Sequence, residues 1–217
     1  MDTPPTIREP RAQDPTETPR LAVEVAALYP PQGQWTEVDY FYLPDTNRYL
    51  ELSEGELLMP PHPTRRHQAA VQELYVRLRA FVQAHNLGEV YIAPLPVRLW
   101  PGKIREPDVL FMAQEHAERM GEQAFGPPDL VVEVLSPHTR YTDRMEKSNE
   151  YARAGIPEYW IVDPEARTAE VFVLQARAYE LLGKWHAGDM AHSALLQGFQ
   201  ISVEELFPIS EAQGLLP

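Results

Sequence analysis

The stretch Leu130-Val131-Val132-Glu133-Val134-Leu135 is an apolar run with one carboxylate in its middle. Pro128 and Pro137 bound the run, and a short apolar run between such breakers predicts a strand that is buried on both faces of a sheet. Ionised side chains are rarely buried without a partner. We therefore expect Glu133 to be neutral, salt-bridged or bound to a metal ion.

A second acid, Asp108, lies upstream. The stretch Arg105–Met112 predicts another strand, and Asp108 is near the start of its apolar part. Neighbouring strands lie about 4.8 Å apart, so Asp108 and Glu133 could share one ion. Mg²⁺ suits two carboxylates because it prefers oxygen ligands and keeps several waters. Asp129 is on the same strand as Glu133 and would lie roughly 13 Å away, too far to share that ion. The alternative is that Asp108 caps a turn and Glu133 pairs with an arginine.

The composition limits the classes of function. The chain has 217 residues, 44% of them hydrophobic, and a formal net charge of −13 that does not favour nucleic acid binding overall. Because it has no cysteine, disulfides, thiolate catalysis and cysteine–zinc sites are excluded. No apolar run approaches membrane-spanning length, and the N-terminus lacks the layout of a secretory signal. We expect a cytoplasmic protein with no membrane contact.

The chain is predicted to form one domain with two tails. Residues 1–30 are expected to be a disordered tail, since their prolines and polar residues leave little to bury. Residues 31–210 are expected to form the domain, and residues 211–217 a C-terminal tail.

Hydrophobic periodicity and turn residues predict the elements of this domain. The best-supported helix runs over about 64–86, and the helix after the buried strand is predicted to begin at Asp143, with Glu146 three residues later as in a capping box. The other predicted elements are a short helix capped by Thr36, a hairpin over 49–59, strands near 89–93, 97–100 and 157–163, a hairpin of 168–174 with 179–185, and a last helix at 203–206. This order predicts an α/β fold with a mixed sheet.

Lys147 completes the candidate site. It lies on the helix predicted after Glu133 and shares a face with Tyr151. Its side chain is long enough for the ammonium group to reach the two acids. A solvated surface lysine is the alternative. Glu56 is considered as a third acid, and His67 as a ligand or phosphate contact, although a lone histidine is more often structural. The candidates for contacts with backbone phosphates are Arg65, Arg66, Arg140 and Arg144.

At this point the sequence resembles a known family. It closely resembles the Uma-two-type putative restriction endonucleases of the PD-(D/E)XK nuclease superfamily, over about residues 36–196. The resemblance is carried by Pro128–Pro137, Asp143-Arg144, Lys147 and Tyr151–Pro164, and more weakly by Glu54-Gly55-Glu56, His67-Gln68 and Glu106-Pro107-Asp108.

The resemblance implies a restriction-endonuclease-like αβββαβ core, with a mixed central sheet, helices on its faces and added β-hairpins. It also implies DNA cleavage that depends on Mg²⁺, for which Mn²⁺ can substitute, with Asp108 and Glu133 as the metal ligands. The superfamily places a lysine two residues after the second acid, where this chain has Leu135. The resemblance therefore assigns the lysine role to Lys147. DNA is the expected partner, and a homodimer is one option for assembly.

Two other classes of function remain to be weighed. A catalytically inactive nucleic-acid-binding or protein-interaction module on the same fold is favoured slightly by the net charge of −13. Two acids and a lysine favour the enzyme, because a binding module gains nothing from acids near a phosphate. A glycosidase-like carboxylate pair is disfavoured by the lysine and by the lack of an aromatic sugar platform near Asp108.

Overall fold

The computed structural model of the protein describes residues 29–43 and 49–208. The tail predicted over 1–30 lies almost entirely outside these residues, and the tail predicted over 211–217 lies entirely outside them. None of the helices in the described ranges has the length and apolar character needed to cross a membrane.

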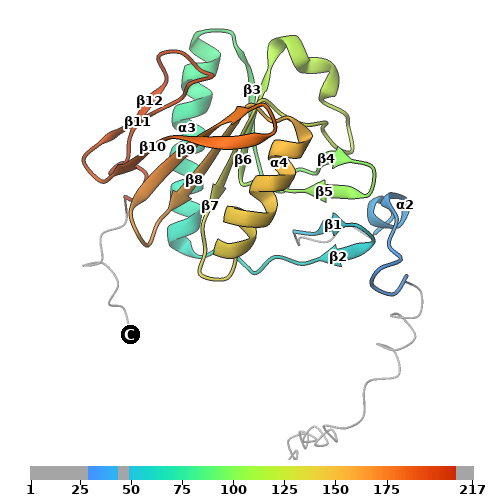
Figure 1. The fold of residues 1–217 in the computed structure, drawn as a ribbon. Coiled ribbons are helices and arrows are strands. Elements are labelled where there is room, and N and C mark those ends of the chain that lie inside the picture. The colour runs from blue at the N-terminus through green and yellow to red at the C-terminus, as the bar shows by residue number, and fades with distance from the viewer. Residues whose placement is uncertain (1–28, 44–48, 209–217) are drawn as a thin grey trace, which may run out of the picture.

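A six-stranded mixed sheet with the order β10-β9-β8-β7-β6-β3 forms the centre of the molecule (Figure 1). Its strands are β3 (Gly88–Ile92), β6 (Val109–Ala113), β7 (Leu130–Val134), β8 (Glu158–Asp163), β9 (Thr168–Gln175) and β10 (Ala178–His186). β3, β6 and β7 pair antiparallel, β8 runs parallel to β7, and β9 and β10 return antiparallel.

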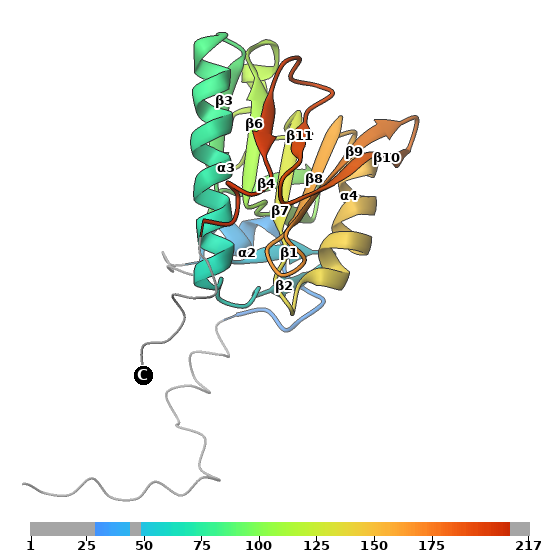
Figure 2. The same ribbon diagram turned by 90° about the vertical axis from the view of Figure 1, so that its left-hand side faces the viewer.

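Two helices cover opposite faces of this sheet (Figure 2). They are α3 (Arg65–Ala84) and α4 (Ser148–Ala154). α3 begins where the sequence predicts, because the side chain of Thr64 accepts a hydrogen bond from the backbone N–H of His67 at 3.2 Å. α3, three antiparallel strands, α4 and the parallel strand β8 follow one another along the chain. The predicted αβββαβ order is therefore confirmed.

Side-chain alternation along β7 decides which residues face which helix. Val132 and Val134 pack in the core cluster that includes the buried face of α3, whereas Val131 and Leu135 pack in the cluster on the α4 side. Successive side chains of a strand point to opposite faces. Glu133 therefore lies on the α4 side, between two residues of that cluster.

A smaller four-stranded sheet with the order β2-β1-β5-β4 lies beside the central one. Its strands are β1 (Glu51–Ser53), β2 (Glu56–Leu58), β4 (Val97–Trp100) and β5 (Lys103–Arg105), and α2 (Glu37–Phe41) packs next to it. α2 starts at Thr36 with a capping box that Thr36 forms with Asp39, as the sequence predicts for this cap. The hairpin expected over 49–59 is β1 with β2.

The single strand predicted over Arg105–Met112 is wrong. β5 ends at Arg105 in the smaller sheet, and β6 begins at Val109 in the central sheet. The link between them contains Pro107, which has no backbone N–H to donate to a ladder. This break lets Glu106 and Asp108 leave the strand geometry at the border of the two sheets.

The helix start predicted at Asp143 is also wrong. The chain is already helical at residues 140–141 and continues through a π-helical segment, η2 (Thr142–Lys147), into α4. Asp143 therefore lies inside the helix and does not cap its N-terminus.

The short helix expected at 203–206 is a turn that follows the small sheet of β11 (Met190–His192) and β12 (Gln200–Ser202). The polar stretch after β6 forms the 3₁₀ helix η1 (Gln114–Arg119).

The pairing of β3 with β6 requires a glycine at its first position. Gly88 has φ +147°, and a Cβ atom there would lie 2.0 Å from the carbonyl oxygen of Met112. We expect Gly88→Ala to lower the free energy of unfolding by roughly 2–4 kcal/mol, because backbone must move to relieve the clash. Urea denaturation measures this loss. Gly102→Ala is the control, since Gly102 has φ +81° in open space, and should cost about 1 kcal/mol; equal losses would contradict the clash.

Candidate active site

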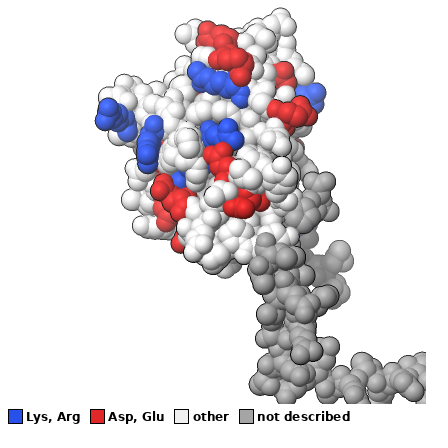
Figure 3. All heavy atoms as spheres, turned by 90° about the vertical axis from the view of Figure 1, so that its right-hand side faces the viewer, with Lys and Arg blue, Asp and Glu red and all other residues white. Residues whose placement is uncertain are grey.

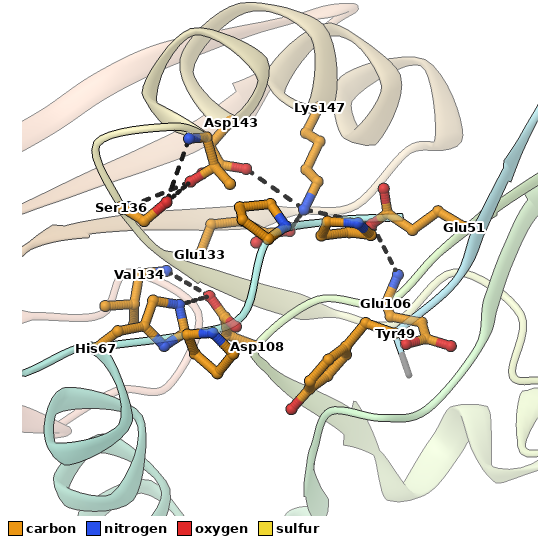
Figure 4. Close-up of a pocket in the computed structure, with 14 residues that line it drawn as sticks. Tyr49, Glu51, His67, Glu106, Asp108, Glu133, Val134, Ser136, Asp143 and Lys147 are labelled. Carbon is orange, nitrogen blue, oxygen red and sulfur yellow. Dashed lines mark hydrogen bonds and ion pairs between the residues drawn. The ribbon is translucent and has the colours of Figure 1, made fainter. Parts of the chain in front are cut away.

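A pocket of about 60 Å³ lies beside the C-terminal end of β7, where the two sheets, α3 and η2 meet (Figure 4). Five carboxylate side chains line this pocket: Glu51, Glu106, Asp108, Glu133 and Asp143. The ionisable nitrogen groups among its lining residues are those of Lys147 and His67. The pocket thus holds a surplus of acids over bases.

Asp108 and Glu133 line the same pocket. Glu133 is on β7, and Asp108 lies in the link just before β6. Val109, which follows Asp108, pairs with Val132, which precedes Glu133, so the two acids come from adjacent places in the fold. The Asp108 carboxylate is fixed by the backbone N–H of Val134, which donates to its Oδ2 at 2.7 Å. The sequence predicts Asp108 on a strand beside that of Glu133, whereas in the structure Asp108 lies in the link just before β6.

Lys147 reaches the acids from the helix above them. Its Nζ lies 3.0 Å from Oε1 of Glu133, 3.4 Å from Oε1 of Glu51 and 3.4 Å from Oδ1 of Asp143. The hydroxyl of Tyr151, one turn further along, donates to the same Glu133 oxygen at 2.6 Å. The side chains of Asp143 and Lys147 point into the site together because they are four residues apart on η2. π-helical turns are frequent at functional sites.

Burial and neighbouring acids disturb the ionisation of this cluster. Glu133 is only 3% exposed. Burial raises its pKa well above the usual range, and repulsion by Asp143 and Asp108 adds to the rise, against the attraction of Lys147. Burial likewise raises the pKa of Asp143. Burial alone would lower the pKa of Lys147, but the carboxylates of Glu133 and Glu51 outweigh it and raise that pKa. The pKa values of the buried acids and of the lysine are therefore all raised, the acids by burial and the lysine by the carboxylates around it.

Glu51 and Glu106 enter the pocket from the smaller sheet. Arg105 donates to Oε2 of Glu51 at 2.7 Å, and the charges of Lys147 and Arg105 overcome burial and lower the pKa of Glu51. Glu106 accepts a hydrogen bond from the hydroxyl of Tyr40 at 3.1 Å, and burial raises its pKa to about 7. Its second oxygen, Oε2, is buried with no hydrogen-bond partner in the described part of the chain.

His67 joins the site from the first turn of α3. Its Nε2 lies 3.2 Å from Oδ2 of Asp108, so α3 and β7 hold the same carboxylate oxygen. Burial would lower the pKa of His67, but the hydrogen bond with Asp108 and the charge of Asp108 raise it. His67 thus contacts the site, whereas Glu56 is exposed on β2 and is not among the residues that line the pocket.

The arginines proposed from sequence fall into two groups. Arg144 binds both carboxylate oxygens of Glu170, at 2.8 and 3.0 Å, and Arg140 pairs with Asp163 and Glu165. Arg65 and Arg66 are exposed at the start of α3 and line a cavity next to the site. Asp129 lies apart, with His116 Nδ1 at 2.7 Å from its Oδ1.

Sequence reasoning missed three acids of the pocket: Glu51, Glu106 and Asp143. Glu51 looked like an ordinary hairpin residue, and Asp143 like a helix cap. One available signal for Glu51 was its place between Leu50 and Leu52, which puts its side chain on the strand face opposite to theirs. Helical spacing of four residues from Lys147 was the signal for Asp143.

The donor set fits an open magnesium site rather than a closed one. In the described ranges, no group of three or more histidine or acid side chains forms a ready-made metal cage. Asp108 and Glu133 nevertheless line the same pocket, and Mg²⁺ is commonly held by one or two carboxylates with water in its other positions. The surplus of acids and the unpartnered Oε2 of Glu106 also suit a cation.

Comparisons with known proteins agree with this fold. A mixed sheet built in the order αβββαβ is the restriction-endonuclease-like class of fold. The sequence model of the Uma2 family, described as putative restriction endonuclease, matches residues 37–204, so the chain belongs to that family. This membership supports a nuclease and confirms the resemblance seen in the sequence. A search of curated proteins finds no match.

A solved structure shares the fold. The chain is similar to the crystal structure of a putative nuclease belonging to DUF820 from Anabaena variabilis, with 20% sequence identity and a TM-score of 0.66. The likeness covers 80% of this chain and 97% of the other. At this identity it shows the fold alone.

The raised acid pKa values predict how stability varies with pH. The folded protein keeps protons on Glu133 and Glu106 that the unfolded chain sheds near pH 4.5, and for Glu106 the folded pKa is about 7. Their stabilising contribution is fully present below about pH 4.5 and is lost as pH rises through the folded pKa values. Glu133→Gln should therefore raise the free energy of unfolding at pH 8 by about 1 kcal/mol or more, and change it little at pH 5.

Denaturant melts at the two pH values measure this difference. Glu56→Gln is the matched control, because Glu56 is exposed and lies outside the pocket. A Glu133→Gln protein that is markedly less stable at pH 8 would show instead that Glu133 is an ionised structural partner of Lys147.

Proposed function

We propose that this chain is a cytoplasmic, magnesium-dependent DNA endonuclease that hydrolyses phosphodiester bonds. The observation that carries the proposal is that Asp108 and Glu133 line one pocket that has a surplus of carboxylates and a buried lysine. Membership of the Uma2 family supports the nuclease class. The fold alone would not suffice, because one fold serves many functions.

Asp108 and Glu133 are the proposed metal ligands. Both donors to Glu133, Lys147 and Tyr151, use its Oε1, so Oε2 is the oxygen that we assign to the ion. The contacts of Asp108 with Val134 and His67 use Oδ2, so Oδ1 is assigned in the same way. Bound there, Mg²⁺ would polarise the scissile phosphate and lower the pKa of a water molecule.

Lys147 is proposed to act in the chemical step. Its ammonium is held among Glu133, Glu51 and Asp143, so it is both buried and charged. A charge fixed before the reaction stabilises charge that develops in the transition state, because the enzyme does not reorganise at that moment. Lys147 is therefore assigned to orient the attacking water or to offset the growing negative charge on the phosphate.

A cleavage assay tests the enzyme. With Mg²⁺ or Mn²⁺ and varied DNA substrates, we expect the wild type to cut, and Glu133→Gln and Lys147→Ala each to lower the rate by roughly 10²–10³-fold. Glu56→Gln should cut like the wild type, since Glu56 is outside the pocket. A wild type that binds DNA but never cuts it under these conditions would favour the non-catalytic binding module.

Magnesium should also stabilise the fold. An ion that binds only the folded state raises its stability, so at ten times its Kd it should raise the Tm by about 3–6 °C for a chain of this size. The rise should be larger at pH 8 than at pH 5, where the acids hold protons. Thermal melts should show that Glu133→Gln loses this response and Lys147→Ala retains it. The reverse pattern would place the metal ligands elsewhere.

A further inference from the structure

Two cavities continue from the active-site pocket along the N-terminal end of α3. The first, of about 380 Å³, shares Ser136 with that pocket. The second, of about 80 Å³, shares Arg66 and Pro164 with the first. The two cavities have lining residues in common and so lie side by side, and we call them together the α3 groove.

Arginines dominate the charge of the α3 groove. Its lining includes Arg65, Arg66, Arg140 and Arg167, and the acid among its lining residues is Glu165. Arg140 pairs with Glu165 and with the buried Asp163. Within the described part of the chain, no ion pair involves the other three arginines. The groove is therefore locally positive on a chain with a formal net charge of −13.

The positive charges of Arg65 and Arg66 at the start of α3 favour a bound anion. Arg65 and Arg66 open a helix of 20 residues whose first turn contains no acid. A helix N-terminus carries partial positive charge, so cations there are unfavourable and an anion is favourable. Arg167 has φ +53°, a conformation that costs about 1 kcal/mol for a side chain with a Cβ. Its guanidinium lies 5.4 Å from the ring centre of Phe207, which holds it beside the groove.

The distribution of charge elsewhere differs from that in the groove. On the face shown in Figure 3, acidic and basic side chains are intermixed. Arg144, considered from sequence as a phosphate contact, is bound by Glu170 and is not among the residues that line the groove. Arg167, which the sequence did not single out, lines it instead. Unpaired guanidinium groups in a groove match phosphate, which they bind in a bidentate manner.

We propose that the α3 groove holds backbone phosphates of the nucleic acid next to the bond that is cut, through Arg65, Arg66 and Arg167. This rests on the proposed nuclease function, because the groove meets the active-site pocket at Ser136. Phosphate contacts fix register and orientation but do not read sequence. The groove therefore contributes affinity that is independent of DNA sequence and positions the strand over Asp108 and Glu133.

Salt-dependent binding tests the groove without any cleavage. In EDTA, the fluorescence anisotropy of labelled duplexes gives the affinity at several salt concentrations. Each phosphate contact contributes about 0.9 to the negative slope of log K against log salt. Arg65→Gln, Arg66→Gln and Arg167→Gln should each reduce the slope by about that amount, equally for unrelated sequences. Arg177→Gln, an exposed arginine of the β9–β10 turn outside the groove, should leave it unchanged.

The outcomes separate this proposal from the proposed function. Variants with wild-type slopes and affinities overturn the groove, even if the wild type cuts DNA. Reduced slopes from a protein that never cuts DNA support the groove and refute the nuclease. If inorganic phosphate raises the Tm of the wild type but not of the triple variant, while DNA affinity is equal in both, the groove binds free phosphate and the proposal fails. Equal melting temperatures of the variants without ligand confirm that they are folded.

Discussion

The buried contact between the ammonium of Lys147 and the carboxylate of Glu133, 3.0 Å apart, is the interaction on which the site depends. Both side chains are almost fully buried, so both elements that carry the contact must be placed accurately for it to form. β7 supplies Glu133 by its alternation, and the helical run of η2 and α4 supplies Lys147 and Tyr151. The pairing thus ties α4 to the central sheet at the point where Asp108 also arrives.

The site carries more acid than its cations offset, and this connects stability with function. Lys147 contacts three carboxylates, Arg105 binds Glu51, and burial with repulsion among the acids still raises the pKa of Glu133. A raised acid pKa makes the fold less stable as pH rises. The α3 groove has the opposite sign and shares Ser136 with the pocket. The proposed cation site and the proposed phosphate groove would together form a consistent arrangement for phosphodiester hydrolysis.

Local patterns predicted the elements whose periodicity is strong. The apolar run around Glu133 gave β7, the helical spacing of Ala70, Leu74 and Leu78 gave α3, and turn residues gave the two hairpins. Prediction failed where the backbone changes partner or pitch. The two ends of Arg105–Met112 belong to two different sheets, and the Asp143–Glu146 spacing of a cap occurs inside a π-helical segment.

By itself the sequence determined that a carboxylate lies in a buried strand, that Asp108 precedes a neighbouring strand, and that Lys147 follows on a helix. Hydrophobic periodicity encodes these facts because it depends on residues close in the chain. Only the tertiary structure decided that Glu51, Glu106 and Asp143 join them, and that Arg167 lies in one groove with Arg65 and Arg66. Those residues come from separate strands, turns and helices, and their proximity follows from sheet register and packing, which no local pattern records.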